Sequence, residues 1–215
     1  MILVEEKVEK EVGEYKMSNV SMKHKEETTI VTFKNTHPSI VNSFRRIILD
    51  EVPTFAIEDV EIVKNESPLY DETIAHRLGL LPLTTDLKTY NFKDKCKCKG
   101  VGCALCEVKM SLKAKGEGYV YSKAIKSNDP KICVVDKEIP ITKLFGEKEI
   151  EANLTAIIGK GREHAKWAPA HTYLNDTGKA IDLYIESFGQ LNSKEIFNKS
   201  VEIVVEKIDE LEAQL

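Results

Sequence analysis

Residues 42–86 place a helical pattern, a strand pattern and a second helical pattern in close succession, and this order constrains the fold more than any other feature. The first helical pattern covers Ser39–Leu49, where apolar residues recur at helical spacing and polar residues occupy the opposite side. Pro38 suits the first turn of such a helix, and Pro53 follows its expected end. The pattern predicts an amphipathic helix that buries one face.

A strand and a short helix are predicted in the remainder of this stretch. Phe55–Val63 is rich in apolar residues that acidic ones interrupt, which is typical of a partly buried strand. A helical face then runs from Ile74 to Leu78, and Gly79 and Pro82 close it. The predicted order is therefore helix, strand, helix.

The rest of the chain predicts mainly strands and one last helix. Asn192, followed three residues later by Glu195, has the capping-box spacing expected where that helix begins. The other predicted strands are Ile2–Val12, Thr28–Phe33, Val108–Lys113, Tyr119–Ile125, Ile132–Val135, Ile150–Ile158 and Ala180–Ser187.

Composition limits the classes of function. With 215 residues, 42% of them hydrophobic, the chain is able to bury about 70% of its unfolded surface. The net charge of −4 and an isoelectric point near 5.8 argue against a free-standing nucleic-acid binder, so no direct sequence-specific nucleic-acid binding is expected. The sequence has neither a long apolar run nor a signal-peptide pattern, so we expect a cytoplasmic protein without membrane contact.

Four of the five cysteines lie close together in the pattern C-x-C-x4-C-x2-C, at Cys96, Cys98, Cys103 and Cys106. Four thiolates at such spacing can surround a tetrahedral Zn²⁺, and the glycines between them allow the turn. Structural zinc is the first interpretation; an iron–sulfur cluster and metal-free thiols or disulfides stay open. With four cysteines bound, no position is left for a catalytic water, which disfavours a metalloenzyme. Cys133 is interpreted as a small buried hydrophobic residue.

Lysines surround the cysteine loop, and they would favour thiolates and offset the negative charge of a zinc–tetrathiolate centre. These lysines are Lys93, Lys95, Lys97 and Lys99.

No catalytic residue is predicted. His76 and Arg77 stand near Asp71 and Glu72, which would suit either an acid–base pair or a capped surface helix. The sequence offers no nucleophile, phosphate-binding glycine loop or HExxH pattern to join them. It also has no Asp-x-Asp-x-Asp arrangement of the kind expected of a catalytic magnesium site.

The C-terminal helix carries an apolar seam at spacings of three and four, at Phe197, Val201, Val204 or Val205, Ile208, Leu211 and Leu215. Such a seam has to be buried, either on the chain's own sheet or against a partner helix. Arg45 and Arg46 on the first helix would be solvated charges or contacts across a protein interface.

The motifs NSFRRIILDEVPTFAI and DETIAHRLGLLPL closely resemble the signature of the alpha-like subunits of DNA-directed RNA polymerase, nearest to the archaeal D subunits. Those subunits correspond to the third-largest eukaryotic subunit and to the bacterial alpha N-terminal domain. Weaker similarity extends through WAPAH at Trp167–His171 and YIESFGQL at Tyr184–Leu191. The resemblance covers nearly the whole chain.

The resemblance implies an α+β fold with an alpha-subunit-like dimerisation domain built from both chain ends, residues 1–52 and 172–215. A mainly-β domain, residues 53–171, would be inserted between them and would carry the cysteine loop 96–106. A similarly placed four-cysteine loop binds zinc in the eukaryotic counterpart. Some archaeal D subunits bind iron–sulfur clusters through a separate ferredoxin-like insertion, and that insertion is missing between WAPAH and the Ala180–Ser187 strand.

The implied role is a non-catalytic assembly platform whose enzymatic activity exists in the polymerase complex. It would form a heterodimer with a small alpha-like subunit, called L in archaea, and then recruit the small N and P subunits and the large catalytic subunits. The alternative is a homodimeric zinc-stabilised regulatory protein outside polymerase. The expected partner interface comprises Phe44, Arg45, Arg46, Phe197, Val201, Val204, Ile208 and Leu211.

Overall fold

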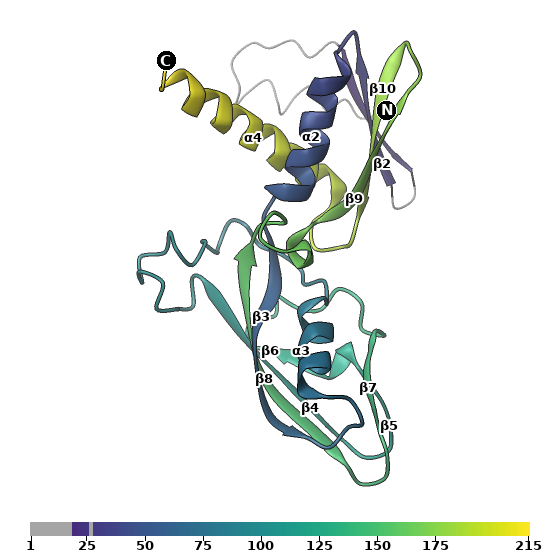
Figure 1. Ribbon diagram of the computed structural model, residues 1–215, viewed down its shortest axis with the longest axis vertical. Coiled ribbons are helices and arrows are strands. Elements are labelled where there is room, and N and C mark those ends of the chain that lie inside the picture. The colour runs from purple at the N-terminus through teal and green to yellow at the C-terminus, as the bar shows by residue number, and fades with distance from the viewer. Residues whose placement is uncertain (1–18, 26–27) are drawn as a thin grey trace. The chain divides into compact units, whose positions relative to one another are not determined.

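The computed structural model describes residues 19–25 and 28–215 (Figure 1). The strand expected at Ile2–Val12 lies outside these ranges. The chain divides into two compact units. The terminal unit contains the described residues up to Glu51 and the segments Ala170–Ser187 and Asn192–Leu215, whereas the central unit contains Val52–Pro169 and Phe188–Leu191.

The terminal unit is built on an antiparallel sheet in the order β1-β2-β10-β9. Its strands are β1 (Val20–Lys25), β2 (Thr28–Lys34), β10 (Ala180–Ser187) and β9 (Ala170–Asp176). Buried residues alternate with half-buried ones along β2 and β10, so one face is turned to the core. Val31 of β2 pairs with Leu183 of β10, and both side chains are fully buried. This pairing joins the two ends of the chain in one sheet.

Helix α2 (Pro38–Asp50) forms where the amphipathic pattern predicted it. Pro38 occupies the first turn, and the His37 side chain caps the helix by accepting from the Ser39 N–H. Val41 and Ile48 are fully buried, and the helix packs against β9, β10 and helix α4. The predicted helix and both of its boundary signals are confirmed.

Helix α4 (Ser193–Glu212) begins at the predicted cap, where the Asn192 side chain accepts a hydrogen bond from the Glu195 N–H at 2.9 Å. Its first half is the part that packs on the unit, through Ile196, Phe197, Ser200 and Ile203. Beyond Ile203 the apolar residues become more exposed: Val204 and Val205 are half-buried, and Ile208 and Leu211 are 51% and 59% exposed. Within this chain the predicted seam is therefore buried only along its first half.

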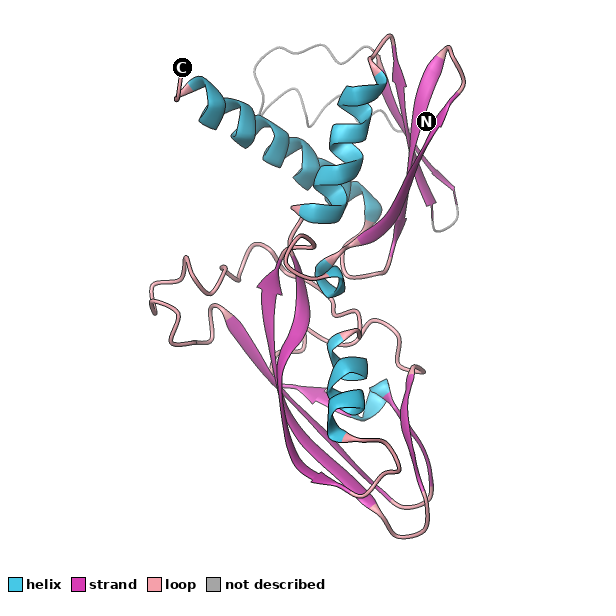
Figure 2. Ribbon diagram, in the orientation of Figure 1, coloured by secondary structure: helices cyan, strands magenta, loops and turns pink. Residues whose placement is uncertain are grey.

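The central unit combines a four-stranded antiparallel sheet, a two-stranded sheet, one α-helix and two 3-10 turns (Figure 2). The larger sheet has the order β3-β8-β4-β6, with β3 (Thr54–Asn65), β8 (Glu149–Gly159), β4 (Glu107–Lys115) and β6 (Ile125–Ser127). The smaller sheet pairs β5 (Gly118–Tyr121) with β7 (Pro140–Leu144). Helix α3 (Asp71–Gly79) places Ile74 and Leu78 in the core, beside Phe55, Leu112 and Leu154.

Two strand predictions in this unit are wrong. Tyr119–Ile125 is not one strand, because a 3-10 turn at Ser122–Ala124 separates β5 from β6. The buried Ser122 hydroxyl donates to the Asp136 carbonyl and accepts from the Ile139 N–H, so the chain bends there. Ile132–Val135 forms no strand either, and Val134 makes a single bridge to Leu83. Ile132 and Val134 are apolar because they pack in the core of the unit.

Three observed strands were not predicted, namely β1, β7 and β9. Along the described ranges, no helix has the length and apolar character needed to cross a membrane.

Candidate functional site

The cysteine loop lies in the central unit directly before β4, which starts at Glu107. The backbone N–H of Asn91 donates to the Leu105 carbonyl at 2.9 Å and closes the base of the loop. Near its tip, Lys99, Gly100 and Gly102 all have positive φ angles, which turn the chain back on itself. The glycines predicted to supply this turn do so.

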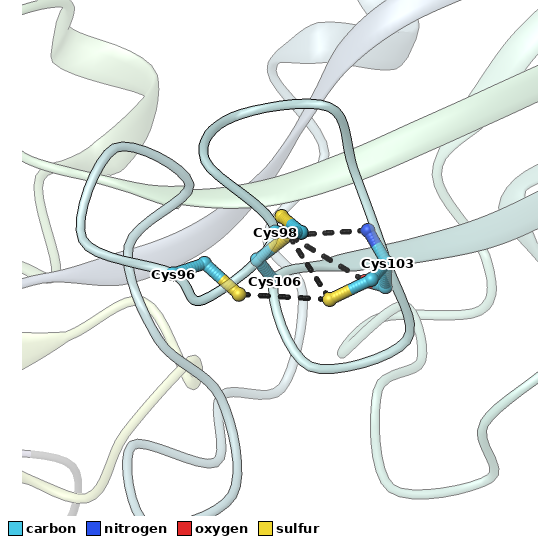
Figure 3. A group of neighbouring side chains, drawn as sticks. All are labelled: Cys96, Cys98, Cys103 and Cys106. Carbon is cyan, nitrogen blue, oxygen red and sulfur yellow. Dashed lines mark hydrogen bonds between the residues drawn. The ribbon is translucent and has the colours of Figure 1, made fainter.

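The turn brings all four predicted cysteines together, and Figure 3 shows their gathered sulfurs. The Sγ atoms of Cys96 and Cys103 are 3.5 Å apart, and those of Cys98 and Cys106 are 3.6 Å apart. Cys103 and Cys106 approach to 3.8 Å, and all four sulfurs lie within 4.8 Å of one another. Throughout the described ranges, this is the group of cysteine, histidine and carboxylate side chains that converges closely enough to hold a metal ion.

These sulfur distances fit a single tetrahedral ion. With a zinc–sulfur bond of about 2.3 Å, the corners of a tetrahedron are about 3.8 Å apart, close to the observed separations. A [4Fe–4S] cluster binds each thiolate to a different iron and holds its thiolates farther apart. Cys133 is half-buried and stands outside the cluster, with its Sγ 3.7 Å from the Thr84 hydroxyl.

The four thiols occupy different environments. Cys96 and Cys106 are buried, whereas Cys98 and Cys103 are half-buried. A hydrogen bond from the Gly102 backbone lowers the pKa of Cys98 to about 6, and burial raises the pKa of Cys106 to about 12. A metal ion that binds here would coordinate Cys98, which ionises readily, and would have to displace the proton of Cys106.

The lysines around the loop are only partly arranged as expected. Lys93 forms an ion pair with Glu107 at 3.5 Å, and Lys109 binds the same carboxylate at 3.1 Å. Lys93 is thus directed at a neighbouring acid. Lys95, Lys97 and Lys99 are exposed around the loop.

A buried tyrosine, which sequence reasoning missed, anchors the start of the loop. The ring of Tyr90 packs edge-on against Phe55 at 5.0 Å, and its hydroxyl donates to Asp129. Burial, together with Asp129, raises the pKa of Tyr90 to about 12. Asp86 caps the preceding turn through Thr89 and forms an ion pair with Lys131 at 3.2 Å. Nothing in the local sequence indicates these long-range partners.

The predicted interface residues of α2 divide between the core and the surface. Phe44 is half-buried and stacks on Phe33 at 5.7 Å between ring centroids. The Arg45 guanidinium donates to the Asn42 side chain at 2.9 Å, one turn earlier. Arg46 is exposed, and it forms no ion pair with another described residue.

The predicted interface residues of α4 follow the same division along the helix. Phe197 is buried and lies 5.9 Å from the Phe44 ring, so it belongs to the core of the terminal unit. Val201 and Val204 are half-buried, whereas Ile208 and Leu211 are exposed. Lys207 binds Glu51 at 3.4 Å and ties this half of α4 to the end of α2.

The side chains near His76 do not form an acid–base pair. Arg77 donates to the Pro140 carbonyl at 2.6 Å, and Asp71 accepts from Asn65 at 2.7 Å. His76 lines a hollow beside β3 together with His164 and Lys166. These contacts tie α3 to β3 and β7, but Tyr70 at its N-cap makes no side-chain capping bond, so the expected cap is not seen.

Comparison with known proteins adds the family. The family model described as RNA polymerase Rpb3/RpoA insert domain matches residues 60–175, more than half of the chain. The chain belongs to the Rpb3/RpoA insert-domain family. The matched residues include all four clustered cysteines and most of the central unit, so the cysteine loop is carried by the insert domain itself.

The chain is also similar to individual subunits of RNA polymerase. The chain is 41% identical over 160 residues to DNA-directed RNA polymerase subunit Rpo3 of Methanosphaera stadtmanae, a match that covers 72% of this chain and 59% of that protein. It is 41% identical over 152 residues to Rpo3 of Pyrococcus furiosus, covering 71% and 56%. Rpo3 of Picrophilus torridus is 44% identical over 143 residues, covering 60% and 52%. The chain thus spans less than three fifths of the length of each relative.

Proposed function

We propose that this chain is a non-catalytic assembly subunit of an archaeal DNA-directed RNA polymerase. Its terminal unit would pair with the small alpha-like subunit L, and the heterodimer would then recruit the small N and P subunits and the large catalytic subunits. Nucleotidyl transfer would belong to the assembled complex. Membership of the Rpb3/RpoA family and the similarity to Rpo3 subunits support this role.

The exposed half of α4 is the observation that carries the pairing proposal. Ile208 and Leu211 stand on the same face of the helix, and each exposes more than half of its surface. Exposed apolar side chains in a row mark a protein contact or a surface prone to aggregation. Arg46, exposed on the neighbouring helix α2, offers a guanidinium for a carboxylate or carbonyl across the same contact.

The pairing is tested by co-expressing the chain with the L subunit of the same organism and recording native mass spectra. We expect a one-to-one heterodimer that the double change Ile208→Asp and Leu211→Asp abolishes. Val63→Asp is the matched control, because Val63 is 57% exposed on β3 of the central unit. The control should leave the heterodimer intact.

Other outcomes would redirect the assignment. A stable homodimer that ignores L would favour the alternative function, a zinc-stabilised regulator outside polymerase. If the heterodimer survives the double aspartate change, the exposed half of α4 is not part of the interface.

We also propose that Cys96, Cys98, Cys103 and Cys106 hold a structural zinc ion. The sulfur separations support one tetrahedral ion, and four protein ligands leave no position for a reacting water. When bound, zinc supplies a cross-link between the two halves of the loop. The cysteines would hold that cross-link directly before β4, where it would stiffen the start of the strand.

The zinc proposal is tested by measuring metal content after anaerobic purification. Wild-type protein and Cys133→Ser should each retain about one zinc per chain, whereas Cys98→Ser should lose most of it. Cys133 is the matched control because it stands outside the cluster. Iron and acid-labile sulfide in the wild-type protein would instead assign an iron–sulfur cluster to this loop.

A further inference from the structure

A group of aromatic rings, two of them exposed and one half-buried, lies at the two-stranded sheet β5–β7. Tyr119 and Tyr121 occupy alternate positions of β5, with the buried Val120 between them. On β7, Lys143 lies directly opposite Tyr119. Phe145 directly follows the end of β7 at Leu144. Tyr119 and Phe145 are 59% and 49% exposed. We call Tyr119, Tyr121, Lys143 and Phe145 the aromatic platform.

A lysine holds the rings of the platform together. The Lys143 ammonium lies 5.3 Å from the centre of the Tyr119 ring and 5.0 Å from that of Phe145, within the range of cation–π attraction. The rings of Tyr119 and Tyr121 are 6.1 Å apart. The side chains are thus arranged in advance, which lowers the entropy lost when a ligand binds.

The charges around the platform leave one ammonium without a counter-ion. Lys123 lies 5.1 Å from the Tyr121 ring, but Glu138 neutralises it at 3.1 Å. Arg77 on α3 donates to the Pro140 carbonyl, which fixes the guanidinium beside β7 without neutralising its charge, and it is not part of the platform. Lys143 is in ion-pair contact with no carboxylate of the described chain. The platform therefore offers a single positive centre flanked by apolar rings.

We propose that the aromatic platform binds an acidic segment of a partner protein, in which apolar side chains flank a carboxylate. One carboxylate matches the one free ammonium, and the flanking apolar groups would cover the rings of Tyr119 and Phe145. Aromatic residues are enriched at the energetic centres of protein interfaces, where a surrounding ring of contacts excludes water. The platform belongs to the central unit, so this inference stands apart from pairing through α4.

The single ammonium of the platform and the negative net charge of the chain argue against single-stranded nucleic acid as the ligand. Stacked bases would suit the rings, but a nucleic-acid strand brings a row of phosphates that need several cations along a groove. The platform supplies one free ammonium, and the net charge of −4 on the chain repels a polyanion. A short acidic peptide carries far less charge to neutralise.

The proposal is tested by fluorescence anisotropy on the full chain. The probe is a short fluorescein-labelled peptide that alternates aspartate and leucine, and the comparison peptide carries lysine in place of aspartate. We expect saturable binding of the acidic peptide alone. Lys143→Glu and Phe145→Ala should each weaken it by about tenfold or more. Lys179→Glu, which makes the same charge change on the exposed turn before β10, should leave the affinity unchanged.

Three results would overturn the proposal. The first is equal affinity for wild-type protein and Lys143→Glu, and the second is the absence of saturable binding to the acidic peptide. The third is tighter binding of an oligothymidylate that Lys143→Glu abolishes, which would make nucleic acid the ligand. Lys143→Met keeps the aliphatic stem and removes the charge, so it should reproduce the loss if charge is the cause. Circular dichroism melting verifies that each variant is folded.

Discussion

At the scale of single residues, Asp86 shows how one carboxylate fixes the approach to the cysteine loop. Its side chain accepts from the Thr89 hydroxyl at 2.8 Å and from the Lys88 backbone N–H at 3.0 Å. Lys131 approaches it from a distant segment. These donors, led by the Thr89 hydroxyl, lower the pKa of Asp86 to about 2. The ionised form is therefore favoured by folding.

The stabilisation from Asp86 should depend on pH in one direction. Because the folded pKa is depressed, the contribution is present above the ordinary pKa near 3.8 and disappears as pH falls towards about 2. At neutral pH, Asp86→Asn should reduce the free energy of unfolding by about 1 kcal/mol after solvent screening is allowed for. Urea unfolding of both proteins across this range measures the difference, which should shrink below pH about 4.

Asp209→Asn provides the control for this prediction, since it makes the same charge change on the exposed half of α4. A difference between wild type and Asp86→Asn that stays constant down to pH about 2 would show that the capping bonds do not favour the charged form.

At the scale of elements, β8 and the turn after it depend on close packing around one glycine. Trp167, the single tryptophan of the chain, is buried against the end of β8. A Cβ atom placed on Gly159 would lie 2.3 Å from its ring. The Trp167 carbonyl also accepts from the Thr54 hydroxyl at 2.8 Å, which ties the start of β3 to the same place. The indole has little room to withdraw.

Replacement of Gly159 should therefore be costly. Gly159→Ala should lower the free energy of unfolding by about 1–3 kcal/mol, because the indole has to leave its packed position. Denaturant unfolding measures the loss, and the fluorescence of the single tryptophan should shift towards that of an exposed indole.

Gly79→Ala is the matched control for Gly159→Ala. A Cβ atom at Gly79 would make an ordinary contact of 3.6 Å with the Ile57 carbonyl, and alanine favours the helix. The control should leave stability unchanged or slightly raised. Equal stability for Gly159→Ala and wild type would mean that Trp167 repacks without cost.

At the scale of the whole molecule, the cysteine loop and the core of the central unit are each held by their own contacts. The core is formed by the strands and α3, through side chains such as Phe55, Leu112 and Leu154. The loop joins this core through Tyr90 and through the start of β4. The bond between Asn91 and Leu105 closes the loop on itself.

Metal removal should therefore loosen the loop and spare the sheet. After treatment with a zinc chelator, amides of residues 91–106 should exchange with solvent faster, while those of β8 and β4 stay protected. Hydrogen–deuterium exchange with mass spectrometry measures both regions in one experiment, and Cys98→Ser without chelator should give the same pattern. Loss of protection across β8 would instead make the ion essential to the whole unit.

Features whose signals are local can be predicted from the amino-acid sequence. The amphipathic helix at α2, the Asn192 cap of α4 and the alternation of β10 were all visible in short windows, because capping and periodicity act between near neighbours. The cysteine cluster was equally visible, since all four ligands lie in one short loop with glycines at its turn.

Tertiary structure alone decided the features that join distant segments. The pairing of β2 with β10, the Tyr90–Asp129 bond and the aromatic platform each bring together residues that no local pattern links. The error at Ile132–Val135 has the same origin, because apolar residues beside a core resemble a strand in sequence. The first half of α4 is buried for a related reason, because it packs against α2 and β2, which lie far from it in the sequence.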